Sequence, residues 1–465
     1  MKGSGTRKWL GVLLAASALV APGNAGAQTP REAELEARLQ RLETEMMLMR
    51  ADLAAARSEQ AKTAESVQAA VTSSSATATK VAALETKPQP EGMRVGNTTL
   101  KLGGYIKMVG SNSRFSDGEV ATNTLGRDFY LPQTIPTGNG HASRVQDFTA
   151  KQSRFWLTLS TDIAGHMLKG YVETDFQTSA GTQGSQRTTN GYNLALRRAY
   201  VQLDRWTFGQ DWTTFQYTGA LPESTDYVGA TEGTVFVRQP QIRYSAPLSP
   251  HATLHLAVEE PESGTATLGT PAMVENGDDR MPDFVARLAW TGKPGEISLG
   301  GVVRQVRVEN AGVSDQSLGW GLSGAGKLYL TEDKSADVRF MLTYGRNIGR
   351  YVGLNFGPDA VFDPATGKLG DVDVLAALAA VRVPLAPGIR INLMGSYQSL
   401  NYANNLALAG IGGFNKRAWS GAANIFWSPV KAVDLGVEVR HGERRLVNGA
   451  AGALDRIEFA AKYSF

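Results

Sequence analysis

The sequence predicts an all-β transmembrane protein: a 16-stranded antiparallel outer-membrane β-barrel preceded by an N-terminal α-helical coiled coil. Three observations lead to this prediction. The first residues have the composition of a secretory signal, a heptad repeat follows them, and a two-residue alternation of apolar and polar side chains then continues to the last residue. Alternation with apolar residues outward and polar residues inward is typical of membrane barrels that enclose water.

Residues 1–27 are predicted to be a cleaved signal peptide. Three basic residues precede an apolar run over 9–20, and Ala25-Gly26-Ala27 is a small-residue cleavage site. The run is shorter than the about 20 residues that span a bilayer, which argues against a retained anchor. Cleavage removes three of the 47 basic residues, so the mature chain is balanced by its 44 acidic residues and carries no electrostatic indication of nucleic-acid binding. The chain has no cysteine, which excludes disulfides and cysteine-liganded metals.

Residues 28–87 are predicted to form a periplasmic coiled-coil stalk. Apolar residues recur at alternating spacings of four and three, beginning with Leu35, Leu39, Leu42, Met46, Met49, Leu53 and Ala56. One helix cannot bury so narrow a seam by itself, so we expect oligomerisation. The mixture of leucine and methionine leaves the oligomer number open. Pro88, Pro90 and Gly92 end the helix and indicate a linker over 88–96.

Residues 97–465 are predicted to be the 16-stranded porin domain. Leu102, Gly104, Ile106 and Met108 share one face of the first segment, and alternate residues from Ile457 to Phe465 share one face of the last. Short turns alternate with longer polar loops, among them 111–152, 178–193, 213–237, 260–281 and 346–370. Short turns are typical of the periplasmic rim, and an even number of strands places both barrel ends there.

A soluble β-sandwich or propeller would also show alternation. Three features disfavour it: the predicted strands are long, their connections alternate in length, and aromatic residues gather near strand ends. These aromatic residues are Tyr244, Trp290, Tyr344, Trp427 and Tyr463, where an aromatic girdle would lie. No internal repeat of propeller length is visible.

A barrel of sixteen strands leaves an aqueous channel. Basic residues on the inward face are the candidate pore-lining and substrate-binding residues: Lys107, Arg154, Lys169, Arg198, Arg243, Arg287, Arg304 and Arg339, with Lys327 and Arg390 also inward. The candidate constriction loop, 213–237, carries Glu223, Asp226 and Glu232. Acids opposite a basic wall would order permeating solutes, and arginine suits carboxylates. The alternative for each arginine is that it lies at the rim of the barrel or forms an ion pair within the wall.

The sequence indicates no catalytic residue, metal or cofactor, and we expect no enzyme. Residues 319–324 have the spacing of a dinucleotide-binding motif and 321–327 most of a phosphate loop, but alternation continues and position 328 is leucine. His251 and His255 would lie about 13 Å apart along a strand, too far for one metal ion.

Several motifs carry a family resemblance: 102–107 (LGGYIK), 153–155 (SRF), 198–201 (RAYV), 208–212 (FGQDW) and the terminal 463–465 (YSF). Together they resemble the DcaP-like trimeric outer-membrane porin family. The resemblance implies a homotrimer with a periplasmic coiled coil, and passive diffusion of small anions, notably dicarboxylates. Lys107, Arg154 and Arg198 lie in the matching motifs, whereas the long loop 111–152 departs from the pattern. The terminal Phe465 is similar to the signal read by the barrel-assembly machinery.

The favoured function is therefore an outer-membrane diffusion porin for small hydrophilic solutes, with a preference for anions such as dicarboxylates. Expected partners are two further copies of the chain, outer-membrane lipid and lipopolysaccharide, and the barrel-assembly machinery. The alternative function is an envelope tether, in which the barrel anchors a coiled coil that reaches peptidoglycan. Deletion of 28–92 distinguishes the two, because a porin would still conduct. The sequence specifies neither the solute nor the fold of loop 213–237.

Overall fold

The computed structural model describes residues 92–465 apart from 139, 179–189 and 311. It also describes the helical residues 44–54 and 57–59 and the single residues 38, 41, 62 and 68. The predicted signal peptide and most of the predicted stalk lie outside the described residues. The chain divides into two compact units, Met1–Gln89 and Pro90–Phe465. None of the described helices is both long enough and apolar enough to cross a membrane.

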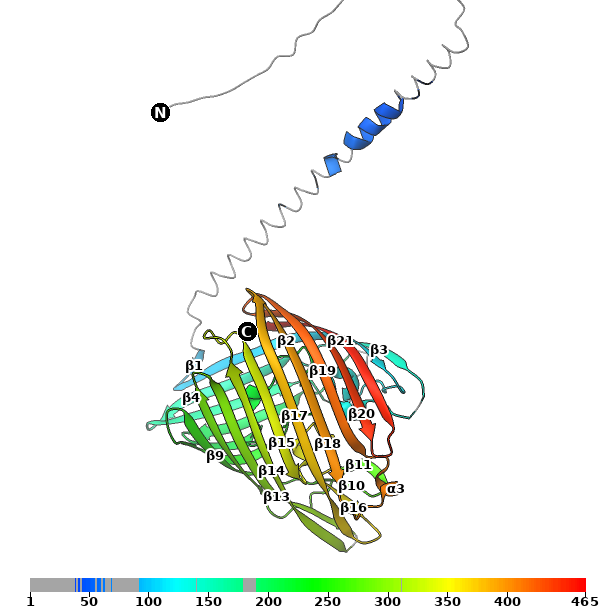
Figure 1. Ribbon diagram of the computed structural model, residues 1–465. Helices are drawn as coiled ribbons and strands as arrows, with labels where there is room; N and C mark the ends of the chain where they lie inside the picture. The colour runs from blue at the N-terminus through cyan, green and yellow to red at the C-terminus, as the bar shows by residue number, and fades with distance from the viewer. Residues whose placement is uncertain are drawn as a thin grey trace, which may run out of the picture. The chain divides into compact units, whose positions relative to one another are not determined.

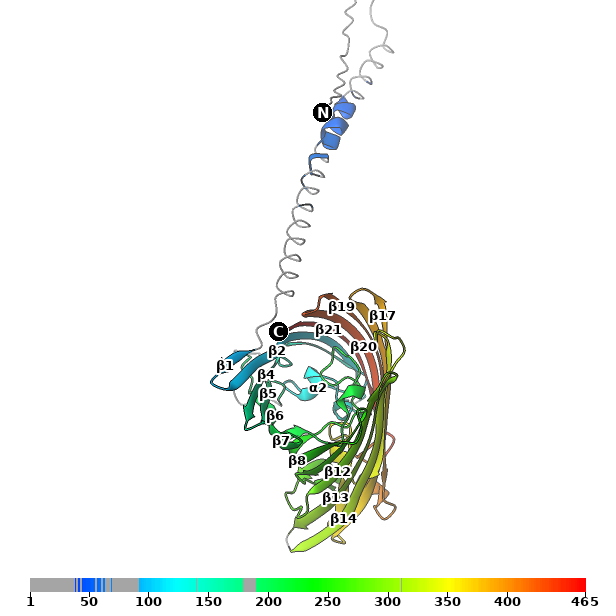
Figure 2. The same cartoon turned by 90° about the vertical axis from the view of Figure 1, so that its left-hand side faces the viewer.

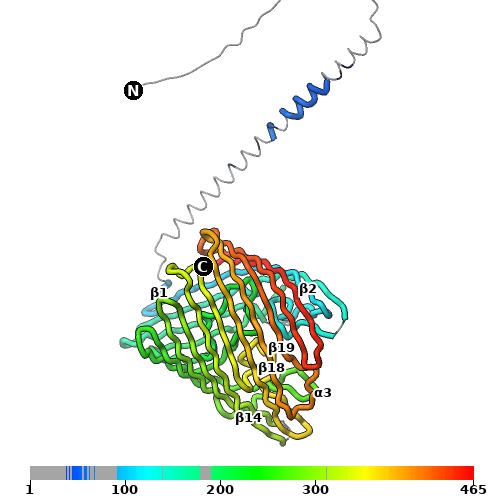
Figure 3. The backbone as a smooth tube through the Cα atoms, in the orientation of Figure 1, coloured from blue at the N-terminus to red at the C-terminus, as the bar shows by residue number. Residues whose placement is uncertain are grey.

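The second unit is a closed antiparallel barrel (Figure 1). Among the described residues its sheet has 21 strands, of which sixteen form the ring. In chain order these are β2 (Thr98–Phe115), β4 (Arg154–Ile163), β5 (His166–Asp175), β6 (Ala195–Leu203), β7 (Trp206–Trp212), β8 (Arg238–Pro247), β9 (Ala252–Glu259), β12 (Asp283–Gly292), β13 (Gly295–Asn310), β14 (Val313–Tyr329), β15 (Asp337–Arg346), β17 (Lys368–Ala386), β18 (Ile389–Tyr402), β19 (Asn415–Val430), β20 (Val433–Leu446) and β21 (Ala451–Ser464). The last strand pairs with the first, from Tyr105↔Ser464 to Phe115↔Leu454, and closes the barrel. The predicted 16-stranded barrel is confirmed, and Figure 3 follows the backbone around the ring.

In addition to the ring strands, the described residues of this unit form five shorter strands and five short helices. The strands are β1 (Met93–Val95), β3 (Ser143–Thr149), β10 (Gly264–Thr267), β11 (Thr270–Glu275) and β16 (Ala360–Asp363). The helices are α2 (Leu125–Asp128), η1 (Pro132–Thr134), η2 (Thr218–Ala220), η3 (Gly349–Tyr351) and α3 (Leu408–Ile411). β10 pairs in parallel with β16, which pairs with β17, so two long loops are joined above the wall.

The structure differs from the prediction in two segments. Residues 93–95, placed in the linker, form β1 and pair with the beginning of β2. The first loop is 116–142 rather than 111–152, because β2 continues to Phe115 and β3 pairs with this extension. The outward residues Asn112 and Arg114 of the extension are polar, so the apolar alternation that marks a strand stops before the strand does.

The outer face of the barrel is apolar, as the alternation predicts. Leu102, Ile106, Leu393 and Ile457 are each more than 50% exposed, while the next residue along each strand is buried. Trp290, Tyr344, Trp427 and Tyr463 are also exposed. Apolar side chains that face out of a closed ring are those that contact lipid in a membrane barrel.

Candidate functional site

Loop 213–237, the candidate constriction loop, leaves the wall after β7 and crosses the lumen before the chain returns as β8. Its residues are bonded to strands elsewhere in the ring. The carbonyl oxygen of Thr225 accepts a hydrogen bond from Nζ of Lys107 on β2, and the amide of Gly233 donates to Oγ of Ser396 on β18, both at 2.7 Å. Figure 2 looks toward the interior, where α2 from the first long loop also lies within the ring.

One side of this loop is packed against the wall by apolar side chains. A single buried cluster contains Phe215, Ala220, Ala230 and Val235 of the loop and Met341, Val374, Ala376 and Leu378 of the wall. The inward face of β17 therefore contacts protein, while its outward face carries the exposed Leu375. A strand that is covered on both faces is expected to be apolar throughout, which explains the longest apolar stretch of the mature sequence, 372–383.

The three acids of the loop are bonded to the neighbouring strands β18, β19 and β21 and to Tyr130 of the first long loop. Glu223 accepts a hydrogen bond from Nε of Arg390 at 2.7 Å and keeps 26% of its side chain exposed. Glu232 is buried and accepts from the hydroxyl groups of Tyr130, at 2.6 Å, and Ser420, at 2.9 Å. Burial raises the pKa of Glu232, and burial beside Glu232 raises that of Tyr130. The sequence identified these acids but not their attachment.

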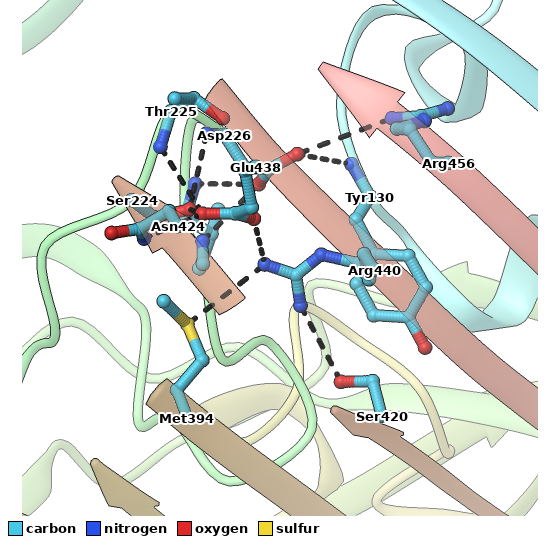
Figure 4. Close-up of polar contacts among 12 residues, drawn as sticks. Tyr130, Ser224, Thr225, Asp226, Met394, Ser420, Asn424, Glu438, Arg440 and Arg456 are labelled. Atoms are coloured by element: carbon cyan, nitrogen blue, oxygen red, sulfur yellow. Dashed lines mark hydrogen bonds and ion pairs between the residues drawn. The ribbon is translucent and has the colours of Figure 1, made fainter. Parts of the chain in front are cut away.

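Asp226 lies at the tip of the loop, within the buried cluster drawn in Figure 4. Its Oδ2 accepts a hydrogen bond from the amide of Tyr130 at 2.7 Å and lies 4.0 Å from Nη1 of Arg456. Beside it, Glu438 accepts from the hydroxyl of Ser224 at 2.6 Å and from Arg440 at 2.7 Å. Arg456 therefore contacts the tip of the loop directly and Arg440 only through Glu438, and neither arginine is among the predicted site residues.

The other side of the lumen carries a line of arginines, here called the arginine row: Arg154, Arg197, Arg198, Arg243 and Arg287. Three acids, Glu173, Asp175 and Asp211, lie between them. Arg154 contacts Asp175 at 2.7 Å, and Asp211 contacts both Arg198 at 2.6 Å and Arg243 at 2.7 Å. Side-chain exposure is 15% for Arg154, 18% for Arg197, 22% for Arg198 and 16% for Arg243. Five guanidinium groups against three carboxylates leave the row with an excess of two positive charges.

Strict alternation assigned Arg198, but not Arg197, to the lumen. Glu173 pairs with Arg198 and the next residue, Thr174, pairs with Leu196, so Arg197 is an extra residue in β6. This β-bulge turns Arg197 inward as well, where it contacts Asp175 at 2.7 Å. Two consecutive arginines in an alternating strand were the signal that could have indicated the bulge.

The remaining predicted pore-lining residues lie apart from the arginine row. Lys107 is 9% exposed and Arg304 is 2% exposed. Arg304 contacts Asp359 at 2.9 Å and Asp283 at 3.4 Å, beneath the loops that follow β9 and β15. Arg339 contacts Asp337 of its own strand at 2.6 Å, and Lys169 is exposed near the short-turn rim.

The sequence motifs that imitate nucleotide sites are parts of the wall. Residues 319–324 lie in the middle of β14, where each residue from 320 onward is paired with both β13 and β15. His251 lies in a turn and His255 in β9. Within the described part of the chain, no three metal-ligating side chains are grouped so that they could hold an ion.

The comparisons with known proteins agree with the barrel. The family model described as DcaP outer membrane protein matches residues 91–465. The outer membrane channel DcaP of Acinetobacter baumannii is similar in fold, with a TM-score of 0.66 and 22% identity over 81% of this chain and 100% of that chain. Weaker likenesses are OmpT, an outer membrane protein of Vibrio cholerae (TM-score 0.49, 10% identity, 81% and 100% covered), and an anion-selective porin from Comamonas acidovorans (0.47, 12%, 79% and 100%). No curated protein sequence matches the chain.

Proposed function

This chain belongs to the DcaP outer membrane protein family, and we propose that it is a diffusion channel of the bacterial outer membrane that prefers small anions, dicarboxylates above all. The observation that carries the preference is the arginine row. Its guanidinium groups are partly exposed on one side of the lumen, and they outnumber the acids between them. An uncompensated positive wall raises the local concentration of anions and lowers that of cations.

The ion pairs of the row support this function because they fix the positions of the arginines. Asp211 binds Nε of Arg198 and Nη2 of Arg243, so each guanidinium has other N–H groups left to bind a solute. A carboxylate that moves along the arginine row exchanges a bidentate contact with one guanidinium group for a bidentate contact with the next. Dicarboxylates suit such a series because one end can bind before the other is released. The same arginines therefore form ion pairs within the wall and, in this proposal, bind the permeating solute.

The pathway runs, in this proposal, between the arginine row and the exposed side of loop 213–237. The loop is packed against the wall formed by β14–β19 and thereby narrows the lumen to the side that carries the row. Arg287 connects the two, since its Nε donates to the carbonyl oxygen of Thr214 in the loop at 2.8 Å. Glu223, the partly exposed acid of the loop, is paired with Arg390 and so adds no uncompensated negative charge to this pathway.

Reversal potentials in planar bilayers test the preference. With a salt gradient across the bilayer, we expect an anion-signed potential for the native protein. The double variant Arg198→Gln and Arg243→Gln should lower the anion-to-cation permeability ratio several-fold. Lys416→Gln and Arg417→Gln remove the same charge from the exposed outer rim and are the matched control. A cation-signed potential for the native protein, or an equal loss in the control, rejects the proposal.

We also propose that the channel is a homotrimer assembled through the predicted stalk. In the described helical residues of the single chain, Met46, Met49 and Leu53 of the heptad seam are at least 50% exposed. Such a seam is buried by other copies of the same helix. Binding of the stalk to peptidoglycan, and reading of Phe465 by the barrel-assembly machinery, are further proposals. Phe465 is the last residue, and its backbone pairs with Gly104 at the seam of the barrel.

A further inference from the structure

Two arginines lie directly opposite each other on the outer face of the barrel. Arg114 of β2 pairs with Arg144 of β3, and both side chains are exposed, whereas the next residues, Ser113 and Val145, are buried. Like charges in this position repel each other. Arg114 lies 3.7 Å from Asp455, and no ion pair joins Arg144 to a described residue. The pair therefore offers more positive charge than its neighbours neutralise.

The arginine pair lies at one end of a continuous line of residues that are paired from strand to strand. From Arg114 this line crosses the wall through Asp455 and His441 to Gly421, Gly395 and Ala379. The arginines lie at the long-loop ends of β2 and β3. Ala379 lies in the half of β17 that leads to the short turn before β18. Because strands in a barrel are tilted, such a line descends from the long-loop rim toward the middle of the wall.

The lower residues of this line of paired residues, Gly421, Gly395 and Ala379, form the floor of a groove of about 1030 Å³ on the outer face. Val381, Leu393, Val439 and Ile457 flank the floor, and Arg114 and Arg144 close the upper end. A Cβ atom added to Gly421 would meet no atom within 4 Å, and one added to Gly395 would meet only a carbonyl oxygen at 3.9 Å. The glycines are thus not required for packing within the chain, and they leave the groove open from outside.

We propose that this groove binds a phosphorylated, acylated glycolipid of the outer leaflet, with an acyl chain over Gly395 and Gly421 and a phosphate between Arg114 and Arg144. The long loops of such barrels are extracellular, so the arginines lie at the level of the outer-leaflet head groups. Two guanidinium groups side by side suit a phosphate, which would also convert their repulsion into two ion pairs. An anionic lipid matches both parts of the site, because its acyl chain suits the apolar groove and its phosphate suits the two arginines.

Native mass spectrometry of the full mature protein in detergent tests this assignment. The probe is a bisphosphorylated hexa-acyl glucosamine disaccharide, compared with the same lipid after removal of its phosphates. We expect the double variant Arg114→Gln and Arg144→Gln to bind the phosphorylated lipid at least tenfold more weakly. Gly421→Leu places a larger side chain in the groove and should weaken the binding of both lipids. Arg346→Gln, another exposed outward arginine near the long-loop rim, should change neither.

Three results would overturn the proposal. Equal binding of the two lipids by the native protein would reject phosphate recognition, and unchanged binding by Gly421→Leu would reject the groove. A loss of oligomers in Gly421→Leu without a loss of lipid would identify the groove as a subunit contact. Measurement of the reversal potential on the same variants separates this site from the pore, since none of them changes a lumen residue and the anion preference should persist.

Discussion

Nζ of Lys107 donates a hydrogen bond to the carbonyl oxygen of Thr225 at 2.7 Å, and so joins the first strand of the ring to the tip of the loop that crosses the lumen. The same group donates to Oε1 of Gln152 at 2.6 Å. Gln152 lies where the second strand is interrupted, because three residues of β2, 106–108, face the four residues 150–153 between β3 and β4. The interruption thus turns the side chain of Gln152 toward the lumen, where it binds Lys107.

Replacing Lys107 should loosen the loop. Lys107→Met keeps the length of the side chain but removes both hydrogen bonds and a positive charge that interacts with Glu458 and Asp226. We expect single-channel recordings to show more frequent current fluctuations and a higher mean conductance. Lys101→Met, at an exposed position of the same strand, is the control. A native-like recording from Lys107→Met would mean that the apolar packing alone holds the loop.

The attachment of the loop should depend on pH through Glu232. Burial raises the pKa of this carboxyl group above its ordinary value of 4.5. The folded loop therefore favours the protonated form of Glu232. The contribution of Glu232 to the stability of the attached loop is complete below the ordinary pKa, and it is lost as the pH rises through the raised pKa. We expect current fluctuations of the native channel to increase over that rise in pH. Glu232→Gln cannot ionise, and it should remove the dependence; an unchanged dependence would assign it to another group.

The buried ion pairs of Arg304 should support the long loops rather than conduction. Arg304→Met would leave Asp283 and Asp359 without their closest cation at positions with no exposure. Loss of one partner of a buried pair costs about 3–5 kcal/mol. We expect urea unfolding in lipid vesicles to show a loss of this order, with a smaller loss for Arg304→Lys. The anion preference of folded channels should be kept, and a change of preference without a change of stability would place Arg304 in the pathway.

Deletion of 28–92 should separate assembly from conduction. The deletion stops before β1 and removes no ring strand. If the predicted stalk assembles the channel, light scattering in detergent should detect trimers of the mature protein and smaller species after deletion, while bilayer recordings still show anion-preferring pores. Loss of conductance would contradict a barrel that acts as a channel by itself. An envelope defect with normal conductance would favour the tether.

Alternation assigns each residue of a strand to a face but does not show which other parts of the chain cover that residue. Alternation places Arg154, Arg198 and Arg243 on the inward face, and the structure brings them together around Asp211 and Asp175. It also places Arg304 inside, but the loops that cover Arg304 come from other parts of the chain. Arg197 was missed because one extra residue in β6 reverses the faces of the residues beyond it.

The sequence by itself determined the class of the protein, since a two-residue period maintained from the first strand to Phe465 fits a wall with lipid on one side and polar groups on the other. Strand number, the alternation of turns and loops, and the rim that carries both ends follow from the same local pattern. Only the tertiary structure decided where loop 213–237 lies, which acids are bonded to the wall and which arginines stay partly exposed. These depend on contacts between residues more than a hundred positions apart, such as Lys107 and Thr225, whose meeting is set by closure of the ring.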